Sequence, residues 1–195
     1  MKVSMGELML QMEHQGEKNF PLFSFDFSGK IFNVVLTYVK KTEELDENEC
    51  FINIQVQTEE QDVAILSGKV KLDGFSNKHE FFSLGLGNTG IKHKSWSQVE
   101  KKSNHTPGLV GETIKQLLLS KVFHRWVSST SLSTGAVAMY ERLKSTDEVS
   151  VEKTFTNQRP NWFSRTFGLA KDSLFFYTVT ASKNPPKKAG FPVLN

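Results

Sequence analysis

The chain has 195 residues, a length typical of one domain, and its 24 basic and 21 acidic side chains leave a net charge of +3. This near balance gives no indication of a nucleic-acid-binding domain. Cys50 is the only cysteine, which excludes an intramolecular disulfide and a cysteine zinc site and is typical of a reduced compartment. The sequence contains neither a signal peptide nor an apolar run of about 18 residues, so we expect a cytoplasmic protein outside the membrane.

The first half of the chain predicts two β-hairpins. Methionine and leucine at helical spacing indicate a short helix over residues 5–12. Phenylalanines that alternate with polar residues predict a strand over 23–27, and Ser28-Gly29-Lys30 can turn the chain into a β-branched strand over 31–40. After an acidic connector over 41–50, we expect a strand over 51–56, a bend at 59–62, a strand over 63–72 and an extended segment over 80–86.

The second half predicts helices between strands. Residues 85–111 are rich in glycine and lysine and indicate a loop, with one short strand at 96–99. We then expect a helix over 112–120, a strand over 122–128, a helix over 133–144, a strand over 149–156, a loop over 157–168 and a strand over 174–181. The strands at 122–128 and 149–156 require a right-handed crossover if they are parallel, and their short connections also allow an antiparallel arrangement.

This order of elements predicts the α+β class. We expect a single mixed, mostly antiparallel sheet with the β-hairpins first and flanking helices. One domain would span residues 1–183, and residues 184–195 would form an extended C-terminal tail, because they are rich in proline and lysine.

Two features of the loop over 85–111 are candidate binding sites. Gly85-Leu-Gly-Asn-Thr-Gly90 has the glycine spacing of a pyrophosphate loop, but residues 91–100 make a poor amphipathic helix, and a helix must follow such a loop. Lys92-His93-Lys94 and Lys101-Lys102 flank Trp96, which could stack a base, although the small net charge favours solvated lysines. The five histidines lack the spacing of a metal site, so we expect no metal.

The most informative segment is residues 107–153, PGLVGETIKQLLLSKVFHRWVSSTSLSTGAVAMYERLKSTDEVSVEK. It resembles the second half of the GNAT family of N-acetyltransferases. That family has a glycine-bearing pyrophosphate loop, a helix, a strand, a second helix ending in a phrase like N-x-x-A-x-x-x-Y-x-[KR]-L-G-F, and a further strand. Ala136, Tyr140, Arg142 and Leu143 fall on that phrase at the right offsets, and the preceding hairpins suit the family's N-terminal half.

The resemblance implies a GNAT-like domain that transfers an acetyl group from acetyl-CoA to an amine. Tyr140 would be the general acid that protonates the coenzyme A thiolate. Glu80, Glu100 and His124 are possible bases for the incoming amine. The implied cofactor-binding residues are the backbone of the loop before the first helix, a hydroxyl just after it and the residue in place of the family's asparagine: Gly108, Leu109, Val110, Gly111, Thr113 and Ser133.

A second hypothesis comes from the departures from that family. Val110 adds bulk where the family's loop has a second small residue, Ser133 replaces the asparagine, and Lys144-Ser145 replaces the Gly-Phe. These changes are compatible with a catalytically inactive GNAT-like binding or structural protein, of viral or mobile-element origin, that acts through protein–protein contacts. The helix over 133–144 is also explained by packing alone, because its apolar stripe has ordinary amphipathic spacing.

Overall fold

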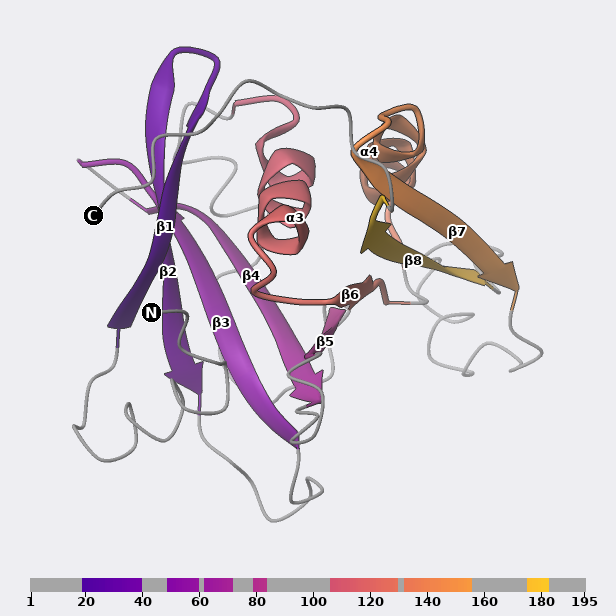
Figure 1. The fold of residues 1–195 in the computed structure, drawn as a ribbon, viewed down its shortest axis with the longest axis horizontal. Coiled ribbons are helices and arrows are strands. Elements are labelled where there is room, and N and C mark those ends of the chain that lie inside the picture. Colours follow the sequence, from indigo (N-terminus) through magenta and orange to yellow (C-terminus); the bar gives the residue numbers. More distant parts are fainter. Residues whose placement is uncertain are drawn as a thin grey trace.

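The computed structural model describes residues 19–39, 49–59, 62–71, 79–83, 106–129, 132–155 and 175–182. They form one mixed sheet of eight strands in the order β1-β2-β3-β4-β5-β6-β8-β7, with the helices α3 and α4. This confirms the α+β class with a single sheet. In Figure 1 the long strands β1 to β4 lie on one side of α3, and α4 lies with β7 and β8 on the other.

Both predicted hairpins are confirmed. β1 (Asn19–Phe27) and β2 (Lys30–Val39) are antiparallel and joined by Ser28 and Gly29, which have positive φ angles of 54° and 72°. Two consecutive left-handed residues match the right-handed twist of the flanking strands, which is why glycine suits this position. β3 (Glu49–Gln57) and β4 (Asp62–Lys71) form the second hairpin, and β5 (Glu80–Ser83) adds antiparallel to β4.

The core lies on one face of these strands. Because alternate residues point to opposite faces, each strand contributes a row of apolar side chains to that face. At most 4% of the surface of each is exposed in Phe32, Val34, Leu36, Ile52, Ile54, Val56, Ala64, Leu66 and Val70. The helix α3 (Leu109–Leu119) covers them with Ile114, Leu117 and Leu118. Apolar burial of this kind is the main stabilising contribution to the fold.

The second half of the sheet is less regular. β6 (Arg125–Val127) pairs parallel with β5, and β8 (Phe175–Ala181) pairs antiparallel with β6. β7 (Val149–Phe155) pairs antiparallel with β8 and forms the edge of the sheet. Since β6 and β7 both run antiparallel to β8, they run in the same direction, which decides the question that their short connections left open.

Three predicted elements begin several residues away from their predicted starts, and the first is β1, which begins at Asn19 and not at 23. α3 begins at Leu109, three residues before the predicted start at 112, because Gly108 caps the helix in a left-handed conformation and its carbonyl oxygen accepts from Glu112 N–H. β6 covers only Arg125–Val127, because Val122 and Phe123 instead bond back to Leu117 at the end of α3.

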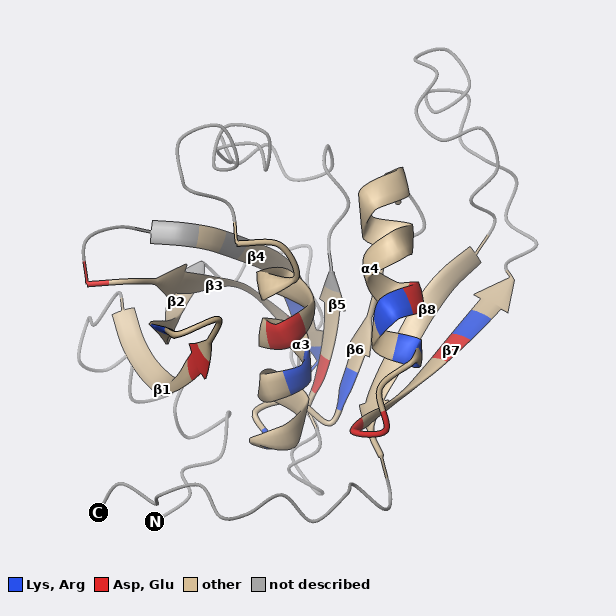
Figure 2. Cartoon of the chain, turned by 90° about the horizontal axis from the view of Figure 1, so that it is seen from above, with Lys and Arg blue, Asp and Glu red and all other residues tan. Residues whose placement is uncertain are grey.

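α4 (Thr134–Lys144) agrees with its prediction. The Ser133 side chain caps it by accepting from Ala136 N–H at 3.2 Å, and Arg142 and Lys144 occupy the last turn, where positive charge stabilises the helix dipole. Viewed from above in Figure 2, α3 and α4 stand next to each other on the same side of the sheet. Neither helix is long and apolar enough to span a membrane. The elements expected at 5–12, 96–99, 157–168 and 184–195 lie outside the described residues.

Candidate functional site

The short strands β5 and β6 pair parallel in the middle of the sheet. Their described ladder holds three pairs, from Glu80 and Arg125 to Phe82 and Val127. On its outer side Ser83 pairs with Gly68 of β4, while Ser128 N–H donates to the Tyr177 carbonyl oxygen of β8 at 2.9 Å. We call this pairing of β5 and β6 the β5–β6 junction.

The N-terminus of α3 supplies backbone donors. Leu109 N–H donates to the Thr106 carbonyl oxygen at 3.1 Å, and Glu112 N–H donates to Gly108 at 2.9 Å. The N–H groups of Val110 and Gly111 lie between them and have no acceptor within the helix, as in the first turn of any α-helix. Gly108 is exposed and left-handed, with a φ of 86°. Because it is a glycine, it adds no side chain to this end of the helix.

Three of the predicted cofactor-binding residues have structural roles. Leu109 is 3% exposed and packs in the core. The buried Thr113 hydroxyl donates to the Leu109 carbonyl oxygen at 2.9 Å, so it bonds within its own helix. A Cβ at Gly111 would lie 3.2 Å from Met139 Cγ, which shows that this glycine allows α3 and α4 to pack closely.

Tyr140 lies between α4 and the sheet. Its side chain is 3% exposed, its ring stacks on Tyr177 with centroids 4.8 Å apart, and its hydroxyl oxygen accepts from Trp126 Nε1–H at 2.9 Å. Burial raises the pKa of Tyr140 to about 12, and the hydrogen bond from Trp126 opposes that rise. No acceptor for the Tyr140 hydroxyl hydrogen is found among the described residues.

Two further aromatic residues fix this arrangement. The Tyr177 hydroxyl donates to Glu141 Oε1 at 2.6 Å, and burial together with that carboxylate raises the pKa of Tyr177 to about 12. Trp126 stacks on Phe81 with centroids 4.1 Å apart. The sequence interpretation missed Trp126 and Tyr177 as site residues. The one available signal was that each lies within a predicted strand and has a large aromatic side chain with a hydrogen-bond donor.

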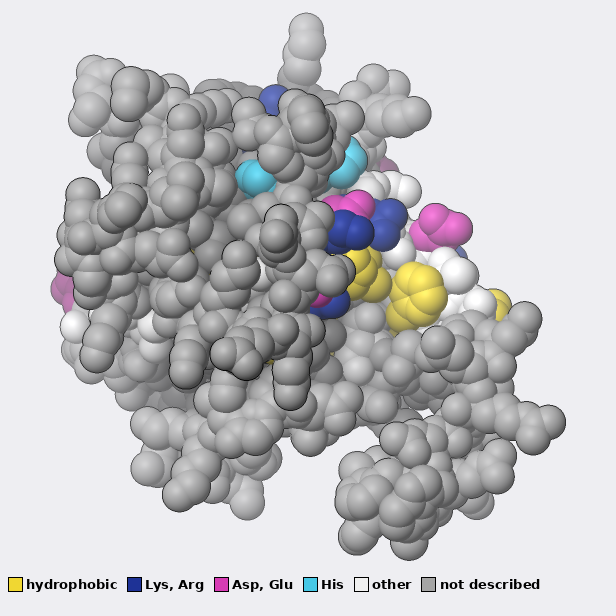
Figure 3. Space-filling model, turned by 90° about the horizontal axis from the view of Figure 1, so that it is seen from below, with side chains coloured by type: hydrophobic (Ala, Val, Ile, Leu, Met, Phe, Trp, Pro, Cys, Tyr) yellow, Lys and Arg dark blue, Asp and Glu magenta, His cyan; other side chains and the backbone are white. Residues whose placement is uncertain are grey.

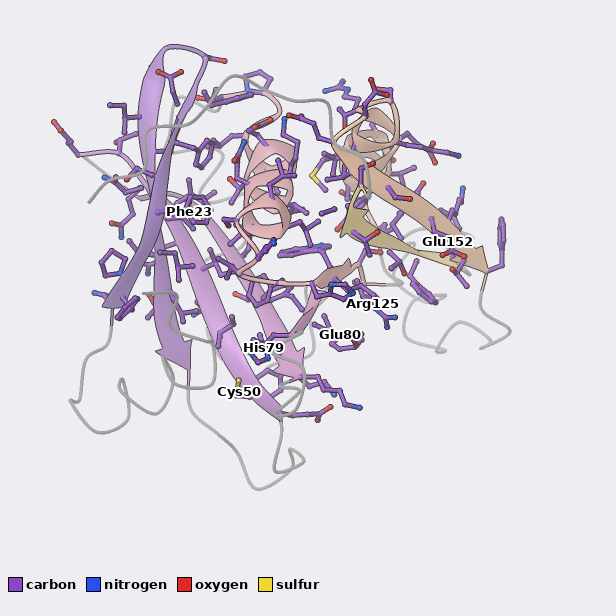
Figure 4. All side chains as sticks on the ribbon, in the orientation of Figure 1. Phe23, Cys50, His79, Glu80, Arg125 and Glu152 are labelled. Atoms are coloured by element: carbon purple, nitrogen blue, oxygen red, sulfur yellow. The ribbon has the colours of Figure 1, made fainter. Side chains whose placement is uncertain are left out.

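The predicted bases do not gather around Tyr140. Glu80 forms an ion pair with Arg125 at 3.3 Å, and Figure 4 shows these two labelled side chains next to each other on β5 and β6. Because Phe81 and Trp126 point into the core, their strand neighbours Glu80 and Arg125 lie on the opposite face from Tyr140. His124 is exposed just before β6, and Glu100 lies outside the described residues.

Some charged side chains of the described residues form ion pairs. The buried Lys115 on α3 contacts Glu112 at 2.8 Å and Glu148, in the turn before β7, at 2.7 Å. Figure 3 likewise shows Lys and Arg side chains beside Asp and Glu side chains on the face seen from below. The described residues contain no group of three or more histidine, cysteine, aspartate or glutamate side chains suited to a metal ion.

An open hollow of about 560 Å³ lies at the C-terminal end of α4. It is lined by Lys144, Thr146, Asp147, Val149, Ser150, Val151 and Ser182. None of the predicted site residues lines it, and polar side chains make up most of its surface. It therefore has no part in the chemistry that Tyr140 could perform.

The described residues define this chain as an α+β protein with one mixed sheet, in which β5 and β6 pair parallel. A scan against protein-family models, a search of curated proteins and a search of solved structures found no match.

Proposed function

We propose that the chain is an acetyl-CoA-dependent N-acetyltransferase-like protein of GNAT-like fold that acts on an amine at the β5–β6 junction. The observation that carries the proposal is the hydrogen bond that places the Tyr140 hydroxyl of α4 against Trp126 of β6, where β6 pairs parallel with β5. The order strand, helix, strand, helix and strand from β5 to β7 also agrees with what the resemblance at residues 107–153 implies.

The junction suits the chemical features of coenzyme A. Its pyrophosphate would lie at the N-terminus of α3, where the N–H groups of Val110 and Gly111 and the helix dipole favour an anion. Gly108 lets the ligand approach the backbone there because it has no side chain. The two amides of the pantetheine arm would pair with backbone N–H and C=O groups, as an added strand does.

Tyr140 would then supply the proton that the leaving group needs. The amine attacks the thioester carbonyl, the tetrahedral intermediate collapses, and the carbon–sulfur bond breaks to release a thiolate. Tyr140 O–H gives its proton to this sulfur, and the proton lost by the attacking nitrogen restores the hydroxyl through solvent. The hydroxyl hydrogen is available for this step because the bond from Trp126 occupies the oxygen as an acceptor.

Replacement of Tyr140 by Phe tests the assignment. We expect Y140F to retain the rise in melting temperature that acetyl-CoA produces in the unchanged protein and to lose about 10²-fold or more in turnover. Y177F is the matched control, since it removes the hydroxyl of the stacked partner, which is bonded to Glu141. Unchanged turnover in Y140F, or equal losses in both variants, would contradict the role of Tyr140.

A second candidate is a catalytically inactive GNAT-like protein that acts through protein contacts. It is favoured by the structural roles of Leu109, Gly111 and Thr113, which explain these residues without a cofactor. Millimolar acetyl-CoA separates the two proposals, because a ligand selective for the native state must raise the melting temperature. The absence of any shift would favour the second candidate.

A further inference from the structure

We propose that Trp126 is a positioning residue for acetyl transfer: its indole N–H holds the Tyr140 oxygen and stabilises the phenolate that forms when Tyr140 protonates the leaving thiolate. This inference rests on the proposed function. It concerns a residue outside the segment that matches the family's helix phrase, and it follows from the contact of Trp126 Nε1 with Tyr140 Oη at 2.9 Å.

The direction of that hydrogen bond is fixed by chemistry. An indole N–H can only donate, so the Tyr140 oxygen must accept, and the phenolic hydrogen must point elsewhere. Tyr140 is 3% exposed, and the described residues offer its hydrogen no acceptor. The bond from Trp126 therefore occupies the Tyr140 oxygen as an acceptor and leaves its hydrogen to be given to another atom. In the proposed reaction that atom is the sulfur of the leaving thiolate.

Both rings are held rigidly. Trp126 is 2% exposed, stacks on Phe81 at 4.1 Å, and has ladder neighbours on each side in Phe81 and Val179. Tyr140 stacks on Tyr177, whose hydroxyl is bonded to Glu141 of the same helix, α4. The N–H donor is therefore already aimed at the oxygen before charge develops there, and no reorganisation is needed during the reaction.

The interaction also strengthens along the reaction. In the resting state a neutral N–H meets a neutral phenol, and after proton transfer the same N–H meets a phenolate. Hydrogen bonds to a charged acceptor are about twice as strong as neutral ones, so Trp126 stabilises the product of proton transfer more than the starting state. Burial works in the opposite direction because it disfavours the phenolate. Among the described residues, Tyr177 stacks on Tyr140 and is bonded to Glu141, whose carboxylate also disfavours a second negative charge, and Lys153 Nζ lies 5.8 Å from the Tyr177 ring centroid, where its positive charge acts in the opposite direction.

A titration that needs no enzyme activity tests the contact. We would place 3,5-difluorotyrosine at position 140, which lowers the phenol pKa into the range where the protein stays folded, and follow ¹⁹F NMR against pH. W126F removes the N–H and keeps an aromatic ring against Phe81. We expect the pKa of residue 140 to be about one unit or more higher in W126F. An unchanged pKa would overturn the inference.

Kinetics then test its consequence. We expect W126F to lower kcat about tenfold or more, to leave the KM for acetyl-CoA unchanged, and to move the alkaline limb of the kcat profile to higher pH. In a Y140F background the same change should cost little further, because both residues serve one proton transfer. A full additional loss in that background, or a raised KM in place of a lowered kcat, would show a structural role only.

Two controls keep the outcomes distinct. If W126F does not fold, benzothienylalanine at position 126 replaces the N–H by sulfur with nearly the same shape, and the same titration decides. If the unchanged protein shows no acetyl transfer, the proposed function fails. The titration still reports whether Trp126 stabilises a phenolate at Tyr140, so a failure of the inference and a failure of the function are separately visible.

Discussion

The β1–β4 half of the sheet and the β5–β8 half are built on different principles. The strands of the first half are nine or ten residues long, and each pairs with its neighbour in sequence. In the second half β6 has three residues, β5 has four, and β8 pairs with a strand that precedes it by almost fifty residues. Short ladders stabilise less, so aromatic stacking carries more of the second half.

The candidate site lies in the second half, where the strands β5 and β6 are short. In the first half the neighbouring strands are paired over long antiparallel ladders. In the second half the described β5–β6 ladder holds three pairs, and α3 begins at Gly108 without a side-chain cap. The first turn of such a helix offers backbone N–H groups that a ligand can bind. The following predictions test whether the two halves depend on each other.

The largest expected effect tests cooperativity. Leu36 on β2 and Leu117 on α3, the helix that lies between the two halves in Figure 1, are both fully buried. We expect Leu36→Ala and Leu117→Ala each to cost about 2–5 kcal/mol, because each leaves a cavity in the shared core. Urea denaturation followed by circular dichroism should show one transition in both variants. A separate early transition in only one of them would show that the halves unfold independently.

The next effect lies where the halves join. Gly68 on β4 faces β5, and a Cβ there would collide with the Phe81 ring and lie 2.7 Å from the Phe82 carbonyl oxygen. We expect Gly68→Ala to lower the free energy of unfolding by about 3 kcal/mol. Gly135→Ala is the control, because its nearest neighbour is Ser133 Oγ at 3.9 Å. Equal stability of the two variants would contradict the close approach of β5 to β4.

A third prediction concerns the ion pairs between α3 and the turn before β7. Lys115→Met leaves Glu112 and Glu148 without their shared cation, and we expect a loss of about 2 kcal/mol at neutral pH, reduced because the carboxylates are partly exposed. The exposed Lys144→Met is the control, with an expected change below about 0.5 kcal/mol. Denaturation curves for both variants should show that difference.

The pH dependence of that loss has a defined sign. Burial lowers the pKa of Lys115, but the Glu112 and Glu148 carboxylates outweigh it and raise the pKa above 10.5. A raised folded-state pKa gives stability that is fully present below the ordinary value and is lost as the pH rises through the folded value. The difference between the unchanged protein and Lys115→Met should therefore shrink above pH 10.5. A difference that grows there would contradict the ion pairs.

The smallest effect is expected at the free edge of the second half. Phe155 at the end of β7 is 73% exposed, with its ring centroid 6.0 Å from that of Phe175. We expect Phe155→Thr to change stability by less than about 0.5 kcal/mol in chemical denaturation. A loss comparable to that of Gly68→Ala would mean that this edge is packed as tightly as the junction.

Features that depend on neighbouring residues were predictable from the sequence, and contacts between distant residues were not. The hairpins, the cap at Ser133 and the apolar stripe of α4 are local patterns, so residues a few positions apart determined them. The site was only partly accessible from sequence. Tyr140 was identified from spacing, whereas its contact with Trp126 depends on how α4 packs on β6, and no local pattern encodes that distance.

By itself, the sequence determined the α+β class, the two hairpins, the helix over 134–144 and Tyr140 as a residue of interest, because periodicity and caps act over one or two turns of chain. Only the tertiary structure decided that β8 lies between β6 and β7, that β5 pairs parallel with β6, and that Glu80 faces away from Tyr140. These facts depend on pairings between residues distant along the chain, whose free energy arises only when the whole core is assembled.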